Sequence, residues 1–234
     1  MFQRKYISLV FPAYNEEAGI EKAIDEFSRL KLFDEIIVVD NNSHDKTAQL
    51  ARAKGVKMVT EKKQGYGYAL RRGMQSAKGD FVVLCEPDGT FSASDTKKLL
   101  SLLSQYDMVL GTRTDKRLLH HNAHMTSFLR LGNIAVAKFL QVLFKTPNLS
   151  DCGCTFRALK KDVAKMVYQE ATVGSSHFLP EMVMLAKLHN YTMKEVPVVY
   201  QQRIGISKIT GSFIKSVQVG TNMVRLILSY RLKK

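Results

Sequence analysis

Short apolar runs alternate with helical apolar patterns through the first half of the chain. The runs predict buried strands at 6–11, 36–40, 56–59, 81–85 and 108–110. Between them, apolar residues recur every three or four positions, which predicts helices that begin near 20, 46, 67 and 94. Strand and helix thus alternate roughly every 20 to 25 residues, as in βαβ units with a mostly parallel sheet.

After Arg113 the pattern changes to longer helices separated by polar loops. Helices are predicted within 124–146 and at about 160–169, 178–189 and 210–230. One more strand is predicted at 195–200, and Pro197 places it at a sheet edge. The helices at 124–146 and 210–230 mix apolar and basic residues. Either a membrane-surface helix or a helix packed on the sheet with its charges in water accounts for this mixture.

Three acids follow predicted strands directly, namely Asp40, Glu86 and Asp88. In an open α/β sheet, ligands bind at the carboxyl ends of the strands, so a shared crevice is expected there. Glu86 and Asp88 are suited to Mg²⁺ or Mn²⁺, which take oxygen ligands and keep positions open for substrate phosphates. Taken alone, this pair is equally consistent with a turn that carries two solvated acids. The glycine motifs of dinucleotide-binding and P-loop proteins are absent from the sequence.

Composition and charge narrow the class of protein further. A hydrophobic content of 45% and a charged content of 24% are ordinary for a folded chain of 234 residues. The net charge of +14 predicts an anionic partner, but the sequence lacks the usual nucleic-acid-binding motifs, so no nucleic acid is expected.

Three cysteines do not form a disulfide framework and are expected to be reduced. No run approaches the length of a membrane span, and the first apolar run is too short for a signal peptide, so the cytoplasm is the expected default location.

A basic loop near the C-terminus has the composition of a phosphate-binding segment. It reads Arg203-Ile-Gly205-Ile-Ser207-Lys208. Arginine binds phosphate through two parallel hydrogen bonds, lysine adds a point charge, and glycine allows the backbone to approach closely. A solvated basic loop is the alternative interpretation of the same residues.

The order of these motifs resembles the family 2 glycosyltransferases of the GT-A fold. The resemblance rests on Pro12-x-Tyr14-Asn15-Glu16-Glu17, on Asp40-x-x-Ser43-x-Asp45-x-Thr47, and on Gly79-Asp80 followed by a strand and an acid-x-Asp. Later pieces are similar to the dolichyl- or polyprenyl-phosphate sugar transferases. They are Asp151-x-x-x-x-Phe-Arg157, Glu181, Glu195-Val-Pro197 and the loop 203–208. The expected fold is therefore a single GT-A domain over 1–234, with a Rossmann-like, mostly parallel sheet and amphipathic interfacial helices.

The resemblance also implies roles for individual residues. Residues 1–113 would form the nucleotide-sugar-binding half, and residues 114–234 would bind the acceptor and lie at the membrane interface. The donor would contact Pro12, Tyr14, Glu16, Asp40, Glu86, Asp88 and Arg113, with Glu86 and Asp88 holding the metal. The acceptor phosphate would contact Arg113, Arg203, Ser207 and Lys208. The catalytic residues would be Asp88, Asp151, Arg203 and Lys208.

Two positions depart from the family pattern. Asn41 stands where Asp-Asp-x-Ser would place a second acid, so the nucleoside contacts are in question. Glu86 stands where the first Asp of Asp-x-Asp is usual, and it is one methylene longer. Metal binding with an altered geometry is expected there.

The favoured function is inverting, metal-dependent transfer of a hexose from a GDP- or UDP-linked donor to a polyprenyl or dolichyl phosphate. A phosphate acceptor is already anionic and needs no general base, and the sequence shows no clear catalytic dyad. An alternative is a hydroxyl acceptor, which would need a base such as Asp151, Glu181 or His177. A second alternative is a nucleotide-sugar-binding protein without turnover. The expected location is peripheral, at the cytoplasmic face of an anionic membrane.

Overall fold

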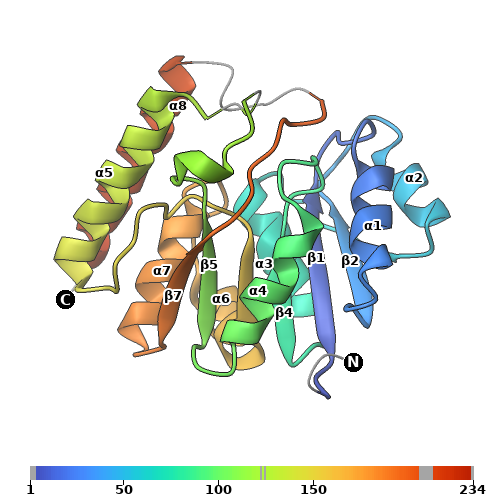
Figure 1. The fold of residues 1–234 in the computed structure, drawn as a ribbon, viewed down its shortest axis with the longest axis horizontal. Helices are drawn as coiled ribbons and strands as arrows, with labels where there is room; N and C mark the ends of the chain where they lie inside the picture. Colours follow the sequence, from blue (N-terminus) through green and yellow to red (C-terminus); the bar gives the residue numbers. More distant parts are fainter. Residues whose placement is uncertain (1–3, 122, 124, 206–212, 233–234) are drawn as a thin grey trace.

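A seven-stranded sheet separates two layers of helices in the computed structural model (Figure 1). The structure describes residues 4–121, 123, 125–205 and 213–232, and within the last range the side chains from residue 217 on. The strand order is β3-β2-β1-β4-β6-β5-β7. The strands are β1 (Ile7–Ala13), β2 (Glu35–Asp40), β3 (Lys57–Thr60), β4 (Phe81–Leu84), β5 (Met108–Thr112), β6 (Arg157–Lys160) and β7 (Met193–Pro197).

The helices cover both faces of the sheet and extend beyond one end of it. Helices α1 (Ile20–Arg29), α2 (Thr47–Ala53) and α4 (Thr96–Leu102) contribute to the core on one face. Helices α3 (Tyr66–Ser76), α6 (Lys161–Glu170) and α7 (Phe178–Leu188) contribute to the core on the other face. Helices α5 (Ser127–Phe144) and α8 (Phe213–Leu232) lie side by side next to α7 (Figure 1). Short 3₁₀ helices occupy Ala93–Asp95 and Lys116–Leu118.

The parallel register aligns the carboxyl ends of the central strands. Strand β1 pairs in parallel with β2, where Ala13 is opposite Asp40, and with β4, where Val10 is opposite Leu84. All seven residues of β1 and all four of β4 are buried, because helices cover both faces. The segments that follow β1, β2 and β4 therefore leave the sheet at the same edge, and this edge carries the candidate site.

The predicted α/β class with a mostly parallel sheet is confirmed. Among the described residues, strand β7 pairs only with β5 and lies at the edge, as Pro197 indicated. Strand β6 was not expected, because Arg157-Ala-Leu-Lys160 consists of good helix formers and directly precedes the helical pattern of α6. It runs antiparallel between β4 and β5. The three cysteines are free, as predicted, and all three are buried.

One expectation about membrane segments is wrong. Within the described residues, α5 is long and apolar enough to cross a membrane by length and composition, with a mean hydropathy of 1.3 over 18 residues. Only 17% of that window is buried within the protein. Such a single helix is weak evidence for a span, because its length and composition fit a surface helix as well.

Helix α3 packs closely on the sheet through Gly73. A Cβ at this position would overlap Val10 Cγ1 and lie 3.1 Å from Val39 Cγ2. Gly73→Ala is therefore expected to lower the free energy of unfolding by about 1–2 kcal/mol, since overpacking outweighs the gain in helix propensity. Chemical denaturation measures the change. Gly132→Ala in α5 is the matched control, because nothing lies within 4 Å of its added methyl group. If Gly73→Ala were as stable as the unmodified protein, this packing argument would be contradicted.

Candidate active site

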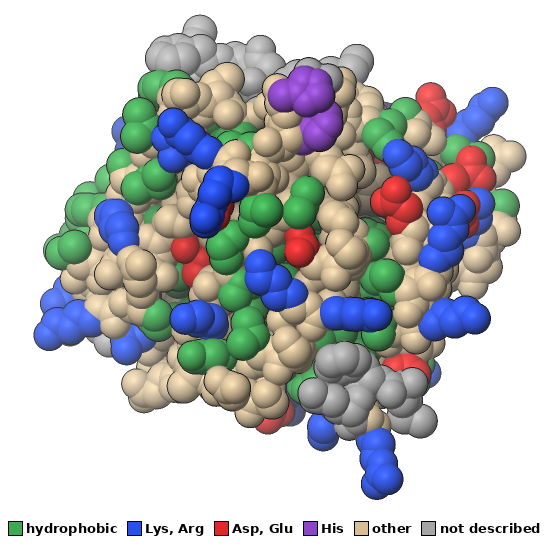
Figure 2. Space-filling view, in the orientation of Figure 1, with side chains coloured by type: hydrophobic (Ala, Val, Ile, Leu, Met, Phe, Trp, Pro, Cys, Tyr) green, Lys and Arg blue, Asp and Glu red, His purple; other side chains and the backbone are tan. Residues whose placement is uncertain are grey.

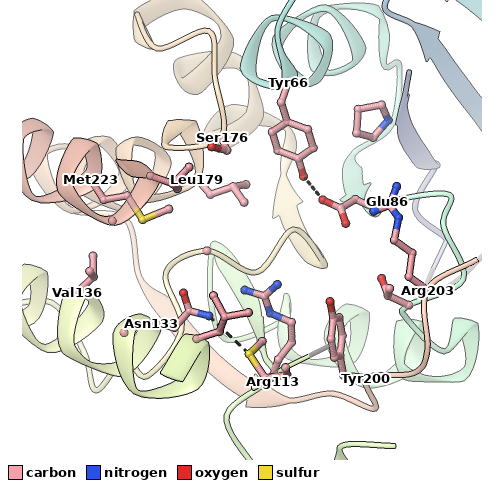
Figure 3. A pocket seen from close by; sticks show the side chains of 18 of the residues that line it. Tyr66, Glu86, Arg113, Asn133, Val136, Ser176, Leu179, Tyr200, Arg203 and Met223 are labelled. Atoms are coloured by element: carbon pink, nitrogen blue, oxygen red, sulfur yellow. Dashed lines mark hydrogen bonds between the residues drawn. The ribbon is translucent and has the colours of Figure 1, made fainter. Parts of the chain in front are cut away.

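A cavity of about 750 Å³ opens at the carboxyl ends of β1, β2 and β4. Figure 3 shows that its two ends differ in character. Glu86 and Arg203 lie at one end, while Val136, Leu179 and Met223 lie at the other (Figure 3). Arg113 and Tyr200 line the wall between these ends (Figure 3). The cavity can therefore accommodate a charged group and an apolar group at the same time.

The two acids after β4 each have one oxygen held by neighbouring hydroxyl groups. Glu86 Oε1 accepts hydrogen bonds from Tyr66 Oη at 2.9 Å and from Thr155 Oγ1 at 3.0 Å. Asp88 Oδ1 accepts from the Thr90 amide at 3.0 Å and from Thr90 Oγ1 at 2.6 Å. Burial, followed by the nearby charge of Asp88, raises the pKa of Glu86 to about 7. The pair is thus a concentrated negative charge that favours a cation.

Arg203 supplies positive charge to this pair in the present structure. Its Nη1 donates to Asp88 Oδ2 at 2.6 Å, and its Nη2 pairs with Glu16 Oε1. Burial lowers the pKa of Arg203, whereas Asp88 and Glu16 raise it, and the net direction is upward. The buried Nε of Arg203 has no hydrogen-bond partner among the described residues. The side-chain hydrogen bonds that Arg203 makes to the described residues therefore go to carboxylates of the site.

Arg113 is fixed against Asp151. Its Nε donates to Asp151 Oδ2 at 2.7 Å and its Nη2 donates to Asp151 Oδ1 at 2.9 Å, which is a two-point ion pair. Asp151 is fully buried and also accepts from the Gly153 amide at 3.1 Å. Burial lowers the pKa of Arg113, whereas the neighbouring charge of Asp151 raises it. The net result is a pKa well above the usual value. Asp151 thus acts on the cavity through Arg113, which lines it.

The segment after β2 places Asn41 rather than Asp40 at the cavity. Asn41 Nδ2 donates to the Glu61 and Lys63 carbonyl oxygens at 2.8 and 2.9 Å, and its Oδ1 accepts from the Gly65 amide at 2.8 Å. The amide therefore closes the loop 61–65 over the end of β2, where Gln64 lines the cavity. Asp40 is not among the described side chains that line it, and Asp40 Oδ1 accepts from the Ser43 amide at 3.2 Å.

The remaining predicted residues fall in three groups. Pro12, Tyr14 and Glu16 line the cavity. Ser207 and Lys208 lie outside the described residues. Glu181 is fully buried and accepts from the Thr172 and Val173 amides and from Tyr230 Oη, so it joins α7 to α8 and to the segment before α7. His177, which was the weaker base candidate, directly precedes α7, and burial lowers its pKa.

Several cavity residues were not expected from the sequence. They include Tyr66, Tyr200 and the apolar side chains of α5 and α8. Thr155, which was also not expected, is buried behind the lining and contacts Tyr66 and Glu86. Arg157 was noted only as part of a motif, yet it is fully buried and organises the turn before β6. Its guanidinium donates to the Cys152, Cys154 and Leu179 carbonyl oxygens at 2.7, 2.8 and 2.8 Å. The only local signal for Tyr66 was its place between two glycines.

The fold and the site together define the class of protein. A mostly parallel α/β sheet with paired acids after β4, facing two arginines, is the arrangement expected of a nucleotide-sugar transferase of the GT-A type. The model of the family "Glycosyl transferase family 2" matches residues 8–167. The chain therefore belongs to glycosyl transferase family 2, which confirms the resemblance seen in the sequence.

Two curated relatives and one solved structure illustrate the similarity. A "dolichyl-phosphate hexose transferase" of Haloferax volcanii is 26% identical over 228 residues, which cover 97% of this chain and 96% of the relative. The "low-salt glycan biosynthesis hexosyltransferase Agl6" of the same organism is 27% identical over 85% of this chain, which spans about half (48%) of that relative. The crystal structure of glucosyl-3-phosphoglycerate synthase from Mycobacterium tuberculosis with Mn²⁺, UDP and phosphoglyceric acid has a TM-score of 0.76. It is 20% identical, with 98% of this chain and 79% of that chain covered, and confirms the fold.

The role of Asn41 can be tested by restoring the residue that is usual in the family. Asn41→Asp replaces the Nδ2 group, which donates both hydrogen bonds, with an oxygen that faces two carbonyl groups. We expect a loss of about 2–4 kcal/mol in the free energy of unfolding, together with weaker binding of UDP or GDP, because the loop 61–65 loses its anchor. Chemical denaturation and calorimetric titration measure the two effects.

Asn42→Asp is the matched control for this prediction. Asn42 also donates to a carbonyl of the same loop, that of Lys62 at 2.7 Å, but it is partly exposed. Losing this hydrogen bond in Asn42→Asp is expected to lower the free energy of unfolding by less than about 1 kcal/mol. If Asn41→Asp were as stable as Asn42→Asp and bound nucleotide as tightly, the anchoring role of Asn41 would be refuted.

Proposed function

We propose that the protein transfers a hexose from a nucleotide-diphosphate sugar to a polyprenyl-type phosphate, with inversion at the anomeric carbon. The observation that carries this proposal is the two-ended cavity, with Glu86 and Arg203 at one end and an apolar wall from α5 and α8 at the other (Figure 3). An acceptor with an anionic head and a long apolar tail fits both ends. The name of the Haloferax volcanii dolichyl-phosphate hexose transferase supports this choice.

The donor is proposed to bind with a divalent cation at Glu86 and Asp88. The described residues form no group of three or more His, Cys, Asp or Glu side chains that could hold a metal. Two carboxylates nevertheless fit Mg²⁺ or Mn²⁺, which commonly take one or two carboxylates and complete their shell with substrate phosphates and water. The M. tuberculosis structure that contains Mn²⁺ and UDP is consistent with this assignment. When bound, the cation stabilises the negative charge of the departing nucleoside diphosphate.

The protein's own groups account for the remaining chemistry. An oxygen of the acceptor phosphate attacks the anomeric carbon, the bond from that carbon to the diphosphate breaks, and the nucleoside diphosphate leaves with the electron pair. Arg113 lines the cavity and is held rigidly by Asp151, so it can bind phosphate oxygens without reorganisation. Arg203 is proposed to bind phosphate once a cation at Asp88 takes the place of its Nη1 contact. Pro12, Tyr14, Glu16 and Asn41 border the space left for the nucleoside. Ser207 and Lys208 are proposed as further acceptor-phosphate ligands.

A phosphate acceptor fits the site better than a hydroxyl acceptor. A hydroxyl group needs a general base within hydrogen-bond reach. Asp151 is fully buried with both oxygens directed to Arg113, and Glu181 is fully buried between α7 and α8. Both carboxylates are thus engaged in structural contacts. A phosphate is already anionic at neutral pH and needs only to be held in place.

A peripheral position at an anionic membrane surface is proposed for the edge that α5 and α8 form. Large apolar side chains are exposed there, including Phe128, Leu131 and Val142 on α5 and Val217 and Leu228 on α8. Figure 2 shows hydrophobic and basic side chains interspersed along the edge of the molecule where α5 lies. Apolar groups would enter the lipid, while Lys and Arg would contribute roughly 1 kcal/mol each through anionic headgroups. The cytoplasmic face, whose leaflet is anionic, is the proposed side.

The reaction is tested with a panel of radiolabelled UDP and GDP hexoses and a polyprenyl phosphate, with Mg²⁺ or Mn²⁺ and with a chelator. We expect one donor to label the organic-extractable lipid, and the chelator to abolish the label. The matching polyprenol, which lacks the phosphate, should accept no sugar. Transfer to polyprenol would instead indicate a hydroxyl acceptor. Donor binding without transfer to any acceptor would indicate a protein that binds nucleotide sugars without turnover.

Arg203→Ala tests the arginine assigned to the acceptor. Loss of one preorganised phosphate donor is expected to lower transfer at least about 100-fold while leaving UDP or GDP affinity within a few-fold. Arg72→Ala is the control for net charge, because Arg72 is exposed on α3 and donates to Gln75. It should retain full activity. Equal losses of transfer in both variants would argue against a specific role for Arg203.

A further inference from the structure

Two hydroxyl groups from distant parts of the chain converge on one oxygen of Glu86. Tyr66 Oη and Thr155 Oγ1 both contact Oε1, at 2.9 and 3.0 Å, and also contact each other. Figure 3 shows the Tyr66 ring reaching across the cavity wall toward the Glu86 carboxylate. Oε2 of Glu86 has no hydrogen-bond partner among the residues that the structure describes. One oxygen is therefore fixed and the other is available.

The two hydroxyl groups are themselves held in place. Tyr66 is the first residue of α3, and the preceding Gly65 is tied to Asn41 through its amide. Thr155 is 2% exposed and lies in the turn whose Cys152 and Cys154 carbonyls bind the buried Arg157. Both hydroxyl groups therefore belong to segments that are fixed by contacts other than those with Glu86.

This arrangement has a counterpart on the second acid. Asp88 Oδ1 is fixed by Thr90, whereas Asp88 Oδ2 faces Arg203. An aspartate has few conformations, so a local threonine suffices to orient it. Glutamate has one more rotatable bond, and the carboxylate of Glu86 would otherwise sample several positions. Ligands that act together must be held within about 0.5 Å of their working geometry.

We propose that Tyr66 and Thr155 are positioning residues that make Glu86 a single-oxygen ligand for the divalent cation. They offset the extra methylene by which Glu86 differs from the aspartate usual in the family. The inference rests on the metal-binding part of the proposed function. It concerns neither the identity of the sugar nor that of the acceptor.

The test measures Mn²⁺ binding by the full chain, from the electron paramagnetic resonance signal of free Mn²⁺, alone and with UDP or GDP. Tyr66→Phe and Thr155→Val are each expected to weaken Mn²⁺ binding 10- to 100-fold, as is typical when an outer-shell partner is lost. Thr155→Ser, which keeps the hydroxyl, should bind within about threefold of the unmodified protein. Tyr68→Phe is the control on the same helix, because the Tyr68 ring lies under Lys63 Nζ and does not contact Glu86.

A double-mutant cycle separates positioning from a general structural effect. In a Glu86→Gln background, Tyr66→Phe and Thr155→Val should no longer change Mn²⁺ affinity, because the group they orient is no longer a carboxylate ligand. The inference is overturned if the single variants bind Mn²⁺ as the unmodified protein does, or if their losses persist in that background. If the unmodified protein binds no Mn²⁺, with or without nucleotide, the proposed metal site fails as well.

Discussion

The repulsion between Glu86 and Asp88 is the constraint around which the cavity is built. Two carboxylates two residues apart, at the buried end of β4, are costly unless cations and hydrogen-bond donors surround them. Burial and the charge of Asp88 raise the pKa of Glu86 to about 7, which is the physical sign of this cost. Arg203 reduces the cost by pairing with Asp88, which lies 115 residues away in the chain. The site is therefore poised to accept a cation and the phosphates that accompany it.

The unexpected strand β6 brings some of the groups that surround these carboxylates into place. By pairing antiparallel with both β4 and β5, it brings the turn 151–156 next to the end of β4. In that turn, Thr155 donates to Glu86 and Asp151 accepts from Arg113. A single segment therefore supports both an acidic and a basic residue of the cavity. Arg157 holds the turn by binding three backbone carbonyls in a fully buried position. A structural arginine thereby supports the chemistry without touching a substrate.

The apolar end of the cavity depends on a different contact, the pairing of α5 with α8. Tyr230 of α8 donates to Glu181 of α7 at 2.7 Å, and Ile227 of α8 is fully buried in the same core as Leu140 of α5. The two helices are thus anchored at their buried faces. Other apolar side chains of the two helices line the cavity or remain exposed. A polar-to-apolar gradient results within one cavity, which is what a phosphate on a hydrocarbon chain requires.

The sequence by itself determined the α/β alternation, the edge position of β7 and the placement of Glu86 and Asp88 at a strand end. These features follow from apolar periodicity and from turn residues that are close together in the chain. Tertiary structure decided which neighbours those acids meet. Asn41 rather than Asp40 lines the cavity, and Glu181 joins two helices, because register and long-range packing select among side chains that look equivalent locally. The contacts of Glu86 with Tyr66 and Thr155 join residues 20 and 69 positions away, and no local pattern encodes such a meeting.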